Sequence, residues 1–120
     1  MEYLSINDIE RACETASPSN HFFEPQAKRF FRSRIGSNVY QGPGGIYFVT
    51  SEQFIGSNGY RAERMFTVRQ FRQWREIREK DGREVSCVSI DTVGQFNSLT
   101  RGQAIAAAKR CSERGPEAIG

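Results

Sequence analysis

The chain has 120 residues, of which 38% are hydrophobic and 26% are charged, and its formal net charge is +3. These values indicate one soluble globular domain that can bury a core without disulfides or metals. They exclude a membrane-spanning helix, because no apolar run approaches the roughly 20 residues that a span needs.

The first half of the chain is expected to begin with two helices. In residues 5–17, SINDIERACETAS, Ser5 is a candidate N-cap, and Ile6, Ile9, Ala12, Cys13 and Ala16 recur at helical spacing. A second helix is expected over residues 24–34, EPQAKRFFRSR, where Pro25 suits the first turn. Its apolar positions recur at helical spacing, and Arg29 and Arg32 are then left on an outward face.

From residue 38 the pattern changes to that of strands. Residues 38–54 read as strand, turn and strand around QGPGG, and both faces of the second strand are largely apolar, which predicts a central strand. Residues 64–71 and 84–96 predict two more strands, and Asp81-Gly82 is a hairpin signal between them. Residues 72–80, RQWREIREK, fit a short helix or an extended hairpin arm, and we favour the arm.

The last helix is expected over residues 100–115, with Thr100 as its cap and Gly115-Pro116 as its end. The order of elements predicts a single α+β domain over residues 1–115. We expect about four antiparallel strands, packed by two N-terminal helices and one C-terminal helix, and a flexible tail over residues 116–120.

Candidate catalytic residues are sparse. His21 is the single histidine, and Cys13, Cys87 and Cys111 are too far apart for a zinc motif or a disulfide framework. The glycines of QGPGG lack the spacing and the following helix of a phosphate-binding loop. The sequence therefore predicts no enzyme, no cofactor and no metal. The odd number of cysteines and the acidic N-terminus, which does not resemble a signal peptide, favour the cytoplasm.

Charge is distributed unevenly along the chain. Residues 1–27 carry five acidic residues and one basic residue, whereas residues 28–83 carry twelve basic and five acidic residues. Arginines and aromatic residues alternate between residues 60 and 83, a composition found both in nucleic-acid surfaces and at protein–protein hot spots. Local pairing with the interspersed carboxylates would neutralise much of this charge, so an ordinary solvated surface is equally compatible with the pattern.

Five further segments form a recognisable pattern over about residues 20–112: HFF, FFRSRI, YFVTSEQF, TVR, and TVGQFNSL before the alanine-rich helix. In this pattern the chain resembles a family of small uncharacterised proteins encoded by bacteriophages and mobile elements. The insert RQWREIREKDGREVSC departs from this pattern, which has a short turn there. The resemblance implies an origin but no reaction, and small accessory proteins of such elements often act by binding.

These observations lead to the hypothesis of a non-enzymatic binding protein that inhibits a host defence system, for example in an anti-CRISPR-like role. Its partner would be a host defence protein or nucleoprotein complex in the bacterial cytoplasm, and the protein would be a monomer or a homodimer without a membrane partner. Direct binding of DNA or RNA is the alternative, and sequestration of an anionic nucleotide signal is a third possibility. The expected contact residues are Arg29, Arg32, Arg69, Arg72, Trp74, Arg75 and Arg78.

Overall fold

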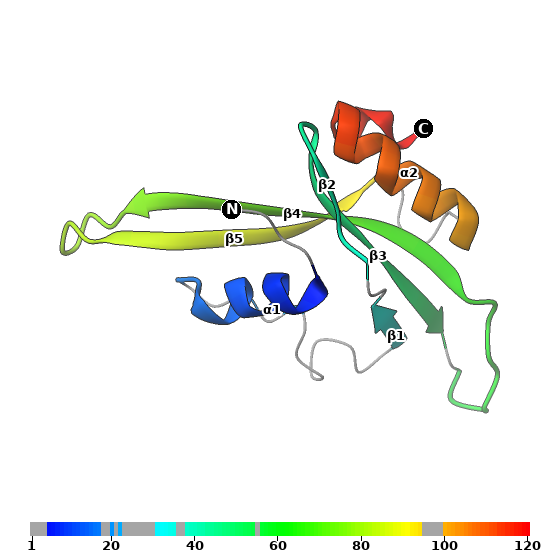
Figure 1. Ribbon diagram of the computed structural model, residues 1–120. Coiled ribbons are helices and arrows are strands. Elements are labelled where there is room, and N and C mark those ends of the chain that lie inside the picture. Colours follow the sequence, from blue (N-terminus) through cyan, green and yellow to red (C-terminus); the bar gives the residue numbers. More distant parts are fainter. Residues whose placement is uncertain are drawn as a thin grey trace.

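A computed structural model describes residues 5–17, 20, 22, 31–35, 38–54, 56–94 and 100–120, and for residues 31–35 and 54 it describes the backbone alone. Its centre is one antiparallel sheet with the strand order β1-β3-β4-β5, in which the short strand β2 also pairs with β3. The strands are β1 (Phe31–Ile35), β2 (Tyr40–Gly42), β3 (Gly45–Phe54), β4 (Met65–Ile77) and β5 (Glu84–Val93). The expected α+β domain with a sheet four strands wide is confirmed (Figure 1).

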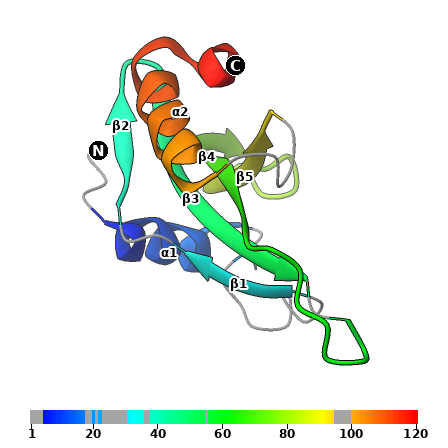
Figure 2. The ribbon, with the colours of Figure 1, turned by 90° about the vertical axis from the view of Figure 1, so that its right-hand side faces the viewer.

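The two helices lie on opposite faces of the sheet. Helix α2 (Arg101–Arg114) packs Ala104, Ala108 and Cys111 against Tyr47 and Val49 of β3. Helix α1 (Ile6–Thr15) packs its buried residues against the other face of the same strand, where Phe48 is buried. Figure 2 shows the two helices on either side of the strands. Since successive side chains of a strand point to opposite faces, β3 is buried on both faces, as its composition predicted.

The first helix begins where the sequence indicated. The backbone N–H of Ser5 donates to the Asp8 carboxylate at 3.1 Å, which closes one half of the expected cap. Ile9 and Cys13 of the predicted apolar stripe are 0% and 1% exposed. The described residues contain no helix that is long and apolar enough to cross a membrane.

The prediction of a second N-terminal helix is wrong for the part that the structure describes. Residues 31–34 belong to β1, which pairs antiparallel with β3 from Phe31 opposite Phe54 to Ile35 opposite Thr50. The first part of the expected helix, residues 24–30, lies outside the described residues. Helical spacing over so short a segment is a weak preference, and pairing with an existing sheet edge overrides it.

The turn between β2 and β3 packs closely against the C-terminal end of α2. The N–H of Gly44 donates to the Ser112 carbonyl at 2.8 Å, and a Cβ at Gly44 would lie 2.2 Å from the Cys111 carbonyl oxygen. The Tyr47 hydroxyl donates to the Gly44 carbonyl at 2.8 Å, and burial raises the pKa of that phenol. The glycines of QGPGG therefore allow a close approach to a helix end within this chain.

The last residues form a short helix, where the sequence suggested a flexible tail. Residues Pro116–Ile119 make the 3-10 helix η2, and Ala118 and Ile119 pack against the core beside α2. The Arg110 guanidinium donates to the carbonyls of Ala118 and Ile119 at 3.1 and 3.2 Å. These contacts hold the segment against the helix that precedes it.

Strands β4 and β5 continue beyond the end of β3. The last pair between β3 and β4 is Ile46 opposite Phe71, whereas β4 and β5 remain paired to Ile77 opposite Glu84. We call residues 72–89 the arm. Its tip extends beyond both helices (Figure 1), and the molecule measures 51 × 34 × 22 Å along its principal axes. The extended form that the sequence favoured for residues 72–80 is confirmed through Ile77, after which the hairpin turn begins.

Candidate interaction surface

The arm is the part of the described chain that presents most side chains to solvent. Every residue from Arg72 to Glu84 is exposed. Alternation along β4 places Arg72, Trp74 and Glu76 on one face of the arm and the intervening side chains on the other. A two-stranded ribbon of this kind offers both faces and its tip to a partner.

Trp74 is the central aromatic residue of the arm and the only tryptophan of the protein. Its side chain is 40% exposed, and its indole Nε1–H donates to the Glu76 carboxylate at 2.8 Å. The Arg72 guanidinium carbon lies 6.0 Å from the centroid of the indole ring, at the outer limit of a cation–π contact. Glu76 and Arg72 thus both contact the exposed indole and restrict its rotation.

Ile77 lies next to the tip and is 73% exposed, the largest exposure among the large apolar side chains at the surface. Burial of such a side chain in a partner contributes about 1.5–3 kcal/mol. Ile77 is not among the contact residues expected from the sequence, because an isoleucine among charged residues fits the apolar content of any strand. Strand β3 begins only at Gly45, so the part of β4 beyond Phe71 has no β3 residue beside it in the described structure, and Ile77 stays exposed.

Three arginines of the arm form ion pairs, two of them within the arm and one with Asp91 just beyond it. Arg72 contacts Asp91 at 3.0 Å, Arg75 lies 3.9 Å from Glu84, and Arg78 contacts Asp81 at 2.7 Å. The Arg78 hydrogen bond and, after it, the Arg83 backbone N–H lower the pKa of the Asp81 carboxyl below its ordinary value of 3.8. Residues 72–84 hold five basic and four acidic residues, so their net charge is only +1.

The tip carries two cations without an ion pair in the described structure. Lys80 and Arg83 flank Asp81-Gly82, and Gly82 has φ +68°, which suits the turn. Positive charge that is available to a partner is therefore concentrated at the tip, beside Ile77.

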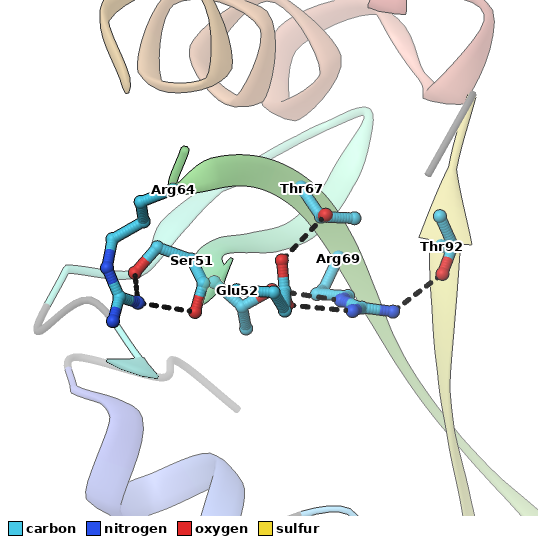
Figure 3. Close-up of polar contacts among 7 residues, drawn as sticks. Ser51, Glu52, Arg64, Thr67, Arg69 and Thr92 are labelled. Atoms are coloured by element: carbon cyan, nitrogen blue, oxygen red, sulfur yellow. Dashed lines mark hydrogen bonds and ion pairs between the residues drawn. The ribbon is translucent and has the colours of Figure 1, made fainter. Parts of the chain in front are cut away.

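Arg69 has a different environment from the other predicted contact residues. Its side chain is 12% exposed and forms an ion pair at 3.1 Å with Glu52, which is 5% exposed (Figure 3). The Glu52 carboxylate also accepts hydrogen bonds from the hydroxyls of Thr50 at 2.6 Å and Thr67 at 3.0 Å. Arg69 is one of the expected contact residues, and in the structure it completes a polar cluster on the sheet face that α1 covers.

Arg69 makes further contacts around this cluster. Its guanidinium donates to the Thr92 hydroxyl at 2.6 Å and to the Thr50 hydroxyl at 3.1 Å, and it lies 5.4 Å from the centroid of the Phe22 ring. No buried side-chain nitrogen or oxygen of the described residues lacks a hydrogen bond. A cluster that is satisfied in this way stabilises the fold and offers no open ligand position.

The structure places the remaining predicted contact residues as follows. Arg72, Trp74, Arg75 and Arg78 lie together on the arm. Arg29 and the side chain of Arg32 lie outside the described residues. Arg32 itself belongs to β1, where its backbone is opposite Gln53, so it is not on the helix face that motivated its choice. Of the predicted contact residues, the structure thus brings together the four that lie on the arm.

The described residues bring together few groups with catalytic chemistry. They contain no cluster of three or more potential metal ligands, and His21 lies outside them. Cys13, Cys87 and Cys111 are buried, and burial raises the pKa of each thiol, that of Cys13 to about 11. The thiolate, which is the nucleophilic form, is thus disfavoured at all three positions.

Comparisons with known proteins identify the family but no activity. No curated protein and no solved structure matches the chain. A family model, described as a family of unknown function (DUF7447), matches residues 5–109, which include α1, the complete sheet and the first part of α2. The chain belongs to this family of unknown function.

Proposed function

We propose that this protein is a non-enzymatic binding protein that docks onto a partner protein through its arm. The observation that carries the proposal is the position of Trp74 and Ile77, which are 40% and 73% exposed on a projecting ribbon. Tryptophan and arginine are enriched at the energetic centres of protein interfaces. Here the rotation of the tryptophan is already restricted by Arg72 and Glu76, so less side-chain entropy is lost when a partner covers it.

The charges of the arm favour a protein partner over a nucleic acid. Nucleic-acid affinity depends on cations that replace counterions along the phosphate backbone. On the arm, Arg72, Arg75 and Arg78 already lie beside carboxylates, and these carboxylates would repel phosphates. Direct binding of DNA or RNA remains the alternative function, and it would depend on the tip cations Lys80 and Arg83.

The resemblance to small proteins of bacteriophages and mobile elements suggests the kind of partner. Within the proposal, the partner is a component of a host defence system, and the arm covers a surface that this component needs for its activity. The arm corresponds to the insert that departs from the resembled pattern, which supports its role as the part particular to this protein.

Site-specific cross-linking tests the docking surface. A photoreactive phenylalanine analogue is introduced in place of Ile77, and irradiated cells are examined for covalent adducts. We expect one discrete protein adduct, which is lost when Trp74→Ala is added. The matched control carries the analogue in place of Tyr60, which is 63% exposed but lies in the loop before β4, at the end of that strand opposite the arm. Equal adducts from both positions would contradict docking through the arm.

A titration of the purified protein distinguishes the alternative function. Trp74 is the only tryptophan, so its fluorescence reports directly on the arm when single- or double-stranded DNA or RNA is added. We expect no change at near-physiological salt and at most weak binding at low salt. Micromolar binding that falls steeply with salt and is removed by Lys80→Gln with Arg83→Gln would instead support the nucleic-acid function.

The host-defence version has its own test. Phage plating is compared in cells that carry an active defence system and express either the wild-type protein or the Trp74→Ala, Ile77→Ala double variant. The proposal expects the wild type to restore plating and the double variant to lose this effect. Equal plating with and without the wild-type protein, across the defence systems tested, would count against this version while leaving the cross-linking result to decide whether the arm docks.

A further inference from the structure

Strand β5 ends the sheet on one side and presents an outer edge there. The hairpin register determines which backbone groups of β5 point toward β4 and which point outward. Arg78 and Arg83 are joined by a backbone hydrogen bond of 2.9 Å, so residues of β5 with odd numbers direct their N–H and C=O groups toward β4. Val88, Ile90 and Thr92 direct theirs outward.

The available part of this edge is short and has defined limits. At one end, the Ser17 N–H donates to the Ser86 carbonyl at 2.7 Å, and no other described residue bonds to the outer edge of β5 through its backbone. At the other end, Gly94 has φ +73°, which turns the chain out of the strand. Residues 87–93, which we call the edge window, lie between these limits, and Ile90 is at their centre.

The composition of the edge window does not protect it. Natural sheet edges are commonly blocked by lysine, by proline, or by inward-pointing charges. The edge window contains no lysine, arginine or proline, and Asp91 is its one charged residue. Val88 and Ile90 are only partly buried, although both contact the core beneath α1. The adjoining arm, in contrast, is densely charged.

The edge window is complementary to itself. If two copies pair antiparallel about a two-fold axis at Ile90, Ile90 lies opposite its own equivalent, Val88 lies opposite Thr92, and Ser89 lies opposite Asp91. Pairs of β-branched side chains stabilise antiparallel strands. The Ser89 hydroxyl donates to Asp91 within each copy at 3.2 Å, so this register places a neutral side chain opposite each carboxylate. Like charges do not meet. This register uses the complete window, because its centre is equally distant from Ser86 and from Gly94.

We propose that this protein forms a homodimer by antiparallel pairing of β5 with β5 of a second copy, centred on Ile90. The outward groups of Val88, Ile90 and Thr92 then supply six backbone hydrogen bonds between the copies. The sheet becomes continuous across the two-fold axis. This inference is independent of the proposed docking function, because it uses the edge of β5 and not the faces or tip of the arm.

Cysteine cross-linking tests the register. Paired Cα atoms at a hydrogen-bonded antiparallel position lie about 5.5 Å apart, within the range of a disulfide. Ile90→Cys is therefore expected to give a covalent dimer under mild oxidation. Val88→Cys is the matched control on the same edge, because in this register residue 88 lies opposite residue 92 and not opposite itself. Dimer yields no higher for Ile90→Cys than for Val88→Cys would overturn the proposal.

Sedimentation equilibrium tests the association without any new cysteine. The wild-type protein is expected to show a concentration-dependent monomer–dimer equilibrium. Ile90→Lys places two like charges directly opposite each other and should raise the dimer Kd by roughly fivefold or more. A wild-type protein that is monomeric up to the highest soluble concentration, or an Ile90→Lys variant that remains folded by circular dichroism and dimerises with unchanged Kd, would refute the dimer.

Discussion

Replacement of Glu52 by alanine is expected to lower the free energy of unfolding by about 3–5 kcal/mol, the cost of removing one partner of a buried ion pair. The structure gives a similar value by a second route. The change removes the carboxylate that accepts from the hydroxyls of Thr50 and Thr67, which are 2% and 1% exposed, and it removes the ion-pair partner of Arg69, which keeps its hydrogen bonds to Thr50 and Thr92. At about 1–3 kcal/mol for each buried hydroxyl that loses this acceptor, the two threonines alone give about 2 kcal/mol or more, and the loss of the ion pair adds to it.

Urea unfolding followed by circular dichroism measures this loss, and Arg69→Met and the double variant Glu52→Ala, Arg69→Met complete a double-mutant cycle. Because the double variant removes both charges, it should be less destabilised than the sum of the single variants by about 2 kcal/mol or more. A cost below about 1 kcal/mol for Glu52→Ala, or strictly additive single changes, would refute the view that Glu52 and Arg69 form a buried, interdependent pair.

Three further predictions concern other parts of the fold. Gly44→Ala should destabilise the protein by more than about 1 kcal/mol in thermal unfolding, because its Cβ would meet the backbone of α2. The control Gly102→Ala, whose Cβ would have no atom within 4 Å, should be neutral or stabilising by up to about 1 kcal/mol. Equal effects of the two changes would contradict the close packing at Gly44. The Cys13 thiol, with its pKa raised from 9.0 to about 11, contributes stability that is complete below pH 9 and is lost as pH rises toward 11, so Cys13→Ser should flatten this alkaline decline in denaturant titrations. Because the pKa of the Asp81 carboxyl is lowered, the carboxylate stabilises the folded turn at neutral pH, and this stabilisation is lost as pH falls through that pKa. An NMR titration of the carboxyl group should find the midpoint below 3.8, and Arg78→Gln should raise the midpoint.

The elements that sequence reasoning located correctly have strong local signals. The cap residues of α1 and α2, the Asp81-Gly82 turn and the apolar faces of β3 depend on neighbours within a few positions. Residues 31–35 lack such a signal, since the same aromatic and arginine residues fit a helix face or a strand. Their pairing with Thr50–Phe54 is a contact between distant segments, and it determined the outcome.

In the candidate site, too, features with local sequence signals could be predicted, and features that depend on contacts between distant segments could not. That Trp74 and its neighbouring arginines lie on an extended hairpin could be predicted from the alternating composition. The burial of Arg69 could not, because it depends on the register that brings Thr67 and Arg69 beside Thr50 and Glu52. The neutralisation of the arm likewise depends on which carboxylate lies across from each arginine, for example Asp91 near Arg72.

Because β3 begins at Gly45 and does not extend along the arm, the length of the arm can vary among related proteins. Beyond Phe71 the arm is a simple ladder of cross-strand pairs that no helix or third strand of the described structure accompanies to its tip. Insertion or deletion of two residues in each strand would change the reach of the arm without moving the core, and it would keep every side chain on its present face. A change of one residue in each strand would exchange the faces beyond that point. Length differences among related chains are therefore expected to come in steps of two residues per strand, so that the tip of the arm can be moved outward while the domain that supports it stays constant.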